Sequence, residues 1–176
     1  LWKEAGLPDG VFNVLHGDKE AVDTLLTDPQ VDSVSFVGST PIAKYIYETA
    51  SAHGKRVQAL GGAKNHMLVL PDADLDITAD SAVNAGYGAA GERCMAISVV
   101  VAVDSIADEL VAKIAERTKG LKIGDGTRES DMGPLITVAH RDKVAGYIDA
   151  GIEAGAELVL DGRTTTPNAD SDAAFL

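Results

Sequence analysis

Cys94 is the only cysteine among the 176 residues, and Arg93 directly precedes it in the chain. A thiol is a strong nucleophile only as the thiolate, and a neighbouring cation favours that form. The pair therefore suggests a cysteine nucleophile for covalent catalysis. A lone cysteine is also often a small buried apolar residue, so the local sequence leaves a structural role open.

A second chemically suggestive sequence is Gly38-Ser39-Thr40-Pro41, which follows the alternating polar and apolar residues 33–37. The pattern predicts a strand, a tight turn and the start of a helix. The free amides and partial positive charge of a helix N-terminus can hold a pyrophosphate group. The same pattern is also found in βα turns that bind nothing, and both interpretations remain open at this point.

Composition argues against several functional classes. Lys and Arg number 15 against 27 Asp and Glu, and the net charge of −12 disfavours nucleic acid as a partner. No apolar run approaches the roughly 20 residues that cross a bilayer, so we expect no membrane partner. A single cysteine fits a reducing compartment, and we expect the cytoplasm. The four histidines lack ligand partners at metal-binding spacing, so we expect no metal site.

Residues 86–91 match the dinucleotide pattern G-x-G-x-x-G. That fingerprint must follow a strand and begin a helix, whereas here a helical pattern precedes it and an extended run follows it. We interpret these glycines as allowing a tight turn that brings the Cys94 amide close to a substrate.

Alternating elements must position these residues. Periodicity predicts strands at 11–15, 33–37, 57–60, 67–70, 98–103 and 158–160, and helices at 20–26, from Pro41 to about Thr49, 74–85, 105–119 and 138–154. Strands that alternate with helices predict an α/β fold with a mainly parallel sheet and flanking helices. Gly61-Gly62 is a plausible domain boundary. The chain has no initiator Met, and we expect it to be part of a longer polypeptide.

Five short motifs occur in order along nearly the whole chain. They are Gly-Leu-Pro-x-Gly-Val-x-Asn at 6–13, Phe-x-Gly-Ser-Thr at 36–40, Leu-Gly-Gly at 60–62, Gly-x-x-Cys at 91–94 and Met-Gly-Pro-Leu at 132–135. Together they resemble the aldehyde dehydrogenase superfamily. Three stretches, 55–59, 62–66 and 89–96, are most similar to its CoA-acylating branch, the methylmalonate-semialdehyde dehydrogenases.

The resemblance implies a two-part architecture. Residues 1–62 would be the C-terminal part of an NAD-binding domain, and residues 63–176 the N-terminal part of the catalytic domain. The chain would be incomplete at both ends. An asparagine of the oxyanion hole would lie before residue 1, and a cofactor-contacting glutamate beyond Leu176. The full-length protein would form a homodimer or homotetramer.

The resemblance also implies the chemistry. Malonate semialdehyde or methylmalonate semialdehyde would be oxidised by NAD through a Cys94 thioester. The substrate carboxyl group would leave as carbon dioxide or bicarbonate, and coenzyme A would take the remaining acyl group to give acetyl-CoA or propionyl-CoA. Arg93 would bind the substrate carboxylate; the alternative is a salt bridge that orients the loop, with Glu92 as one possible partner. The implied cofactor contacts are Gly17, Gly38, Ser39, Ile42 and Gly61.

One departure from the superfamily concerns the acyl acceptor. Hydrolytic members carry a water-activating glutamate, and the ungapped alignment places Leu60 there, 94 − 60 = 34 positions before Cys94. A small alignment shift would place Ala59 or Gln58 there, and neither is a carboxylate. The alternatives are a hydrolytic NAD(P)-dependent aldehyde dehydrogenase whose water is activated from elsewhere, or an inactive structural fragment when the chain is isolated.

Overall fold

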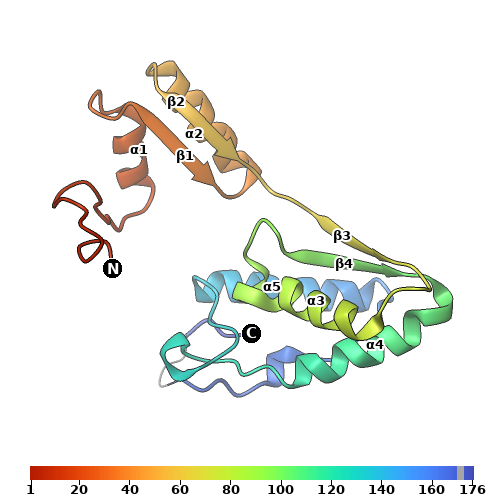
Figure 1. Ribbon diagram of the computed structural model, residues 1–176. Coiled ribbons are helices and arrows are strands. Elements are labelled where there is room, and N and C mark those ends of the chain that lie inside the picture. Colours follow the sequence, from red (N-terminus) through yellow and green to blue (C-terminus); the bar gives the residue numbers. More distant parts are fainter. Residues whose placement is uncertain (170–172) are drawn as a thin grey trace. The chain divides into compact units, whose positions relative to one another are not determined.

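The computed structural model describes residues 1–169 and 173–176, which divide into two compact units, Leu1–Gly62 and Ala63–Leu176 (Figure 1). The first unit contains α1 (Lys19–Thr27), β1 (Ser33–Val37), α2 (Thr40–Ala52) and β2 (Arg56–Leu60). The second contains β3 (Asn65–Val69), α3 (Leu75–Tyr87), η1 (Gly88–Gly91), β4 (Ile97–Ala102), α4 (Asp104–Lys119), η2 (Gly126–Arg128), α5 (Val138–Glu153) and η3 (Gly162–Thr164).

In the first unit, β1 and β2 pair in parallel, with Val34 opposite Val57. Along both strands, exposed side chains alternate with partly buried ones. The partly buried face packs against a buried cluster of Leu26 from α1 and Ile46 and Ala50 from α2. This alternation is typical of a sheet with one covered face, because successive strand residues point to opposite sides.

In the second unit, β3 and β4 also pair in parallel. One face of this sheet packs against α3 and α4 around buried Val69, Ala79 and Leu110. The two helices run side by side beneath the sheet in Figure 1. The fold class expected from the sequence, parallel strands with flanking helices, is therefore confirmed.

Charged side chains brace α3 against α4. Asp76 accepts hydrogen bonds from Lys113 Nζ (2.9 Å) and Arg117 Nη2 (2.8 Å), and Arg117 also contacts Asp80. The Lys113 and Arg117 hydrogen bonds hold the pKa of Asp76 below its ordinary value. The Asp76 and Asp80 side chains are 65% and 62% exposed, so these ion pairs orient the helices more than they stabilise them.

The predictions of two strands are wrong. Residues 11–15 and 158–160 form no strand with any described residue. Their large apolar side chains stay exposed; Val14 is 69% and Leu15 is 73% exposed. A β-branched run favours extended backbone, but a strand also needs a neighbour that supplies hydrogen bonds. The other expected strands and helices are present, with ends shifted by a few residues. No helix within the described residues is long and apolar enough to cross a membrane.

Candidate functional site

Cys94 lies in the turn between η1 and β4, and its thiol is free and exposed. Cys94 is therefore not part of the buried core formed by the described residues. A reagent or substrate can reach the sulfur atom, which is the first requirement for a nucleophile.

The backbone before Cys94 is strained. Ala89 (φ 51°), Ala90 (φ 53°) and Gly91 (φ 73°) are consecutive residues in the left-handed region, which alanine rarely adopts. Such residues cost free energy and cluster at functional sites. The run follows α3 and leads to β4, so residues 86–91 lack the strand-to-helix context of a dinucleotide fingerprint, as the sequence predicted.

Arg93 turns back toward α3. Its Nη2 donates to the carbonyl oxygen of Asn84 at 2.5 Å, and a carbon added to Gly88 would lie 2.9 Å from its Cζ. The guanidinium thus adds a second hydrogen bond to a carbonyl in the last turn of α3, which also accepts from the Gly88 N–H, and it lies against a residue that has no side chain. The loop-orienting alternative for Arg93 therefore has a partner, but that partner is a carbonyl and not the Glu92 carboxylate.

Two further side chains hold the Cys94 turn. The Asn65 Nδ2 atom donates to the carbonyl oxygens of Cys94 (2.8 Å) and Ala96 (2.9 Å). Glu92 lies 3.2 Å from the Nε2 atom of His140, which is in the first turn of α5. Sequence reasoning missed both roles. Asn65 is 29 positions from Cys94 in the chain and His140 is 46, so no local pattern links either to the cysteine.

The expected cofactor residues Gly38, Ser39 and Gly61 gather at the carboxyl end of the first unit's sheet. Gly38 N–H donates to Leu60 O at 3.1 Å, which links the end of β1 to the end of β2. Gly61 follows β2, and a carbon added to it would lie 2.8 Å from Thr40 Oγ1. Ligands of parallel α/β sheets bind at this edge.

The start of α2 fits an anionic group. Ser39 occupies the N-cap position, but among the described residues no amide donates to its hydroxyl. The first-turn amides of Thr40 and Ile42 have no acceptor within the helix by geometry, and Pro41 has no N–H. A free hydroxyl, free amides and the positive end of a 13-residue helix suit a pyrophosphate. The expected apolar contact Ile42 is 48% exposed on this first turn.

Gly17 lies on a different element, directly before the N-cap Asp18 of α1. A carbon added to Gly17 would lie 2.4 Å from the Cβ atom of Ala21, so a side chain there would clash with the first turns of α1. This contact gives the glycine a packing role within the first unit.

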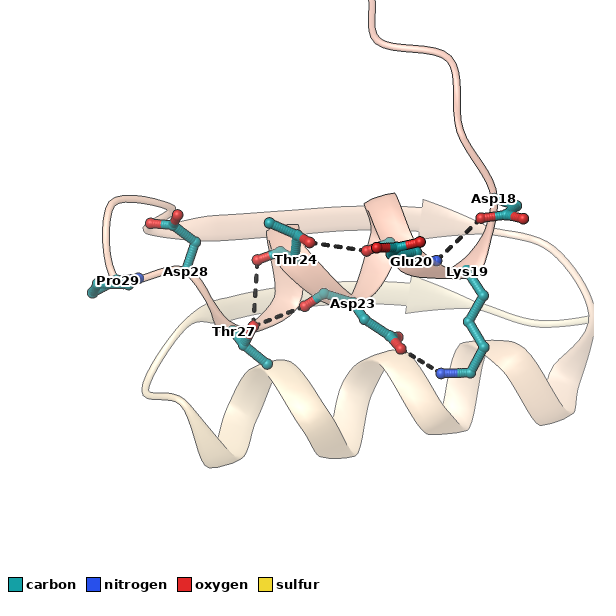
Figure 2. Close-up of a pocket in the computed structure, with 8 residues that line it drawn as sticks. All are labelled: Asp18, Lys19, Glu20, Asp23, Thr24, Thr27, Asp28 and Pro29. Atoms are coloured by element: carbon teal, nitrogen blue, oxygen red, sulfur yellow. Dashed lines mark hydrogen bonds and ion pairs between the residues drawn. The ribbon is translucent and has the colours of Figure 1, made fainter.

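An open groove runs along α1, lined by Asp18, Lys19, Glu20, Asp23, Thr24, Thr27, Asp28 and Pro29 (Figure 2). Its polar groups form hydrogen bonds with one another. The hydrogen bond from Lys19 is the main cause that lowers the pKa of Asp23, and the one from Tyr45 is the second. None of the residues expected to form the site lines it. Among the described residues, no group of three or more His, Cys, Asp or Glu side chains could hold a metal ion.

The model of the Aldehyde dehydrogenase family matches residues 1–176. A malonate-semialdehyde dehydrogenase of Pseudomonas aeruginosa is 62% identical over 165 residues, which cover 93% of this chain and 33% of the relative. Malonate-semialdehyde dehydrogenase 2 of Geobacillus kaustophilus is 57% identical over 164 residues, which cover 93% of this chain and 34% of the relative.

Solved structures agree with these matches. A protein assigned as methylmalonate-semialdehyde dehydrogenase from Sinorhizobium meliloti, in complex with NAD, is 52% identical with a TM-score of 0.86, covering 98% of this chain and 36% of that one. Betaine aldehyde dehydrogenase of Staphylococcus aureus, in complex with NAD+, is 31% identical with a TM-score of 0.77, covering 93% and 33%. This chain spans about a third of the length of the curated relatives it matches.

Proposed function

This chain belongs to the aldehyde dehydrogenase family, and from that premise we propose that the full-length protein is an NAD-dependent, CoA-acylating dehydrogenase of malonate semialdehyde or methylmalonate semialdehyde. The observation that carries the proposal is the exposed Cys94 in a strained, side-chain-anchored turn. The names of the similar proteins support the substrate class, and the NAD complex of one neighbour supports the cofactor.

Cys94 would act as the nucleophile. Its thiolate adds to the aldehyde carbon, and the amide N–H of Cys94 helps to hold the oxyanion. Bound NAD supplies the hydride acceptor for this oxidation. Cys94 then retains the acyl group as a thioester until an acceptor removes it.

The acceptor is proposed to be a thiol, because no carboxylate occupies positions 58, 59 or 60. Leu60 is 50% exposed at the end of β2, while Ala59 packs toward the buried cluster of the first unit. General base catalysis contributes about 10²- to 10⁴-fold, so water attack without it should be slow. A thiol such as coenzyme A is far more nucleophilic and can exchange with a thioester.

The first unit would hold the cofactor. We propose that residues 1–62 belong to the NAD-binding domain and residues 63–176 to the catalytic domain. Gly38 and Ser39 would hold the pyrophosphate at the start of α2, Ile42 would line the adenine side, and Gly61 would contact the nicotinamide side. Gly17 is proposed to line the same cofactor-binding cleft as these residues.

Two expectations concern the protein as a whole. A free, exposed thiol that must stay reduced favours the cytoplasm. Family resemblance favours a homodimer or homotetramer, which light scattering of the full-length protein would distinguish.

Arg93 is predicted to recognise the carboxylate of the substrate with the N–H groups that Asn84 does not use. Arg93→Lys would keep the charge but lose the planar fork. We expect the KM for malonate semialdehyde to rise about 10- to 100-fold, from the loss of one charged hydrogen bond, while the KM for propanal is unchanged. Steady-state kinetics with both aldehydes check this. If Arg93 only orients the loop, both substrates will lose kcat equally.

Product analysis of the full-length protein tests the proposed function. With malonate semialdehyde and NAD, acetyl-CoA should accumulate when coenzyme A is present, and the substrate carboxyl group should be released as carbon dioxide or bicarbonate. Free acid that forms equally fast without coenzyme A would support the hydrolytic alternative instead.

A further inference from the structure

We propose that Asn65 is a positioning residue for the Cys94 nucleophile. Its amide nitrogen donates both of its N–H groups to carbonyls that flank the turn, Cys94 O at 2.8 Å and Ala96 O at 2.9 Å. An amide nitrogen has two donors, so this side chain uses its whole donor capacity on one three-residue segment. The inference rests on the proposed function, because it assigns Asn65 a role in the Cys94 reaction.

The geometry of the sheet aims the side chain at this turn. Asn65 is opposite Ile97, but His66 is opposite Val99, so Ser98 is an extra residue on β4. A bulge of this kind redirects a side chain and ends the regular ladder, and bulges are frequent next to active sites. Here the irregularity lies where β3 begins, so that Asn65 reaches carbonyls that precede β4.

Fixing these two carbonyls fixes the backbone on either side of Met95. The Cys94 carbonyl defines the peptide plane that follows the nucleophile, and thereby limits rotation about the Cα–C bond of Cys94. The preceding residues are held from other directions, Arg93 by the Asn84 carbonyl and Glu92 by His140. Asn65 is the anchor that contacts Cys94 itself.

The buried core of the second unit does not include Asn65. Its buried cluster consists of Val69, Ala79 and Leu110, and β3 pairs with β4 from His66 to Val69 without the Asn65 side chain. Asn65 is only partly buried. We therefore expect its removal to loosen the Cys94 turn while leaving the unit folded.

The test compares Asn65→Leu, similar in volume but without donors, and Asn65→Ser, which keeps one shorter donor, in the full-length protein. A displacement of about 1 Å can cost about 10²-fold in rate. We expect the rate constant of the first NADH burst to fall about 10- to 100-fold in Asn65→Leu and less in Asn65→Ser. The NAD dissociation constant and the aldehyde concentration for half-maximal burst should stay unchanged.

Alkylation of Cys94 by iodoacetamide tests the positioning role of Asn65 separately from the proposed dehydrogenase function, because alkylation needs no catalysis. We expect its rate constant to change at least about threefold in Asn65→Leu. Asn13→Leu is the matched control, since Asn13 Nδ2 donates to the Gly10 carbonyl at 2.8 Å in the first unit, and it should leave the alkylation rate unchanged. Unchanged burst and alkylation rates in Asn65→Leu would overturn the positioning role. A wild-type protein that forms no NADH from malonate semialdehyde and NAD would refute the proposed function, and alkylation would then still decide on positioning.

Discussion

Replacing Cys94 with serine is expected to lower NAD-dependent oxidation of malonate semialdehyde by at least about 10³-fold in the full-length protein. A serine hydroxyl is far less ionised than a thiol near neutral pH, and loss of a covalent nucleophile removes most of the rate enhancement. NADH formation in the presence of coenzyme A measures the effect.

The exposure of Cys94 makes the interpretation of this variant direct. Because the side chain is exposed, the exchange of sulfur for oxygen should leave the thermal unfolding midpoint and the NAD dissociation constant as they are in the wild type. A Cys94→Ser protein that keeps a tenth or more of the wild-type rate would exclude the covalent mechanism.

Leu60→Glu is expected to create turnover that does not need coenzyme A. The Leu60 side chain is 50% exposed at the end of β2, so a carboxylate there remains hydrated, and it occupies the place of the water-activating glutamate in the ungapped alignment. We expect NADH formation without coenzyme A to rise about 10²-fold, the lower limit for general base catalysis.

Two control variants make this second prediction specific. Leu60→Gln has the same shape without a base, and it should not accelerate the reaction. Ala59→Glu would place a carboxylate against the cluster of Leu26, Ile46 and Ala50, so it should lower the thermal unfolding midpoint without adding hydrolysis. If Leu60→Glu and Leu60→Gln behave alike, the missing glutamate does not explain the choice of acceptor.

Local pattern was sufficient to predict most elements of the fold. The alternation along β1 and the apolar spacing along α2 correspond to faces that are buried in the structure. The runs 11–15 and 158–160 have the same β-like composition but remain exposed without a ladder partner among the described residues. Composition reports the preference of a segment, whereas pairing depends on what lies beside it.

The cysteine turn was predictable only in part. Its glycines suggested a tight turn, but left-handed alanines at 89 and 90 could not be foreseen, because alanine ordinarily avoids that conformation. The hydrogen bonds from Asn65 depend on the register of two parallel strands and on a one-residue irregularity. The bond from Arg93 to the Asn84 carbonyl depends on where α3 ends. These are tertiary features, and no spacing in the sequence contains them.

The central claim, an acyl group held on Cys94 until a thiol removes it, is tested most directly by quenching the full-length protein during turnover without coenzyme A and measuring the mass of the peptide that carries Cys94. We predict about one acyl group per chain on this peptide, lost within one turnover when coenzyme A is added. NADH formation without an acyl group on Cys94, or an acyl group that disappears equally fast without coenzyme A, would contradict the account.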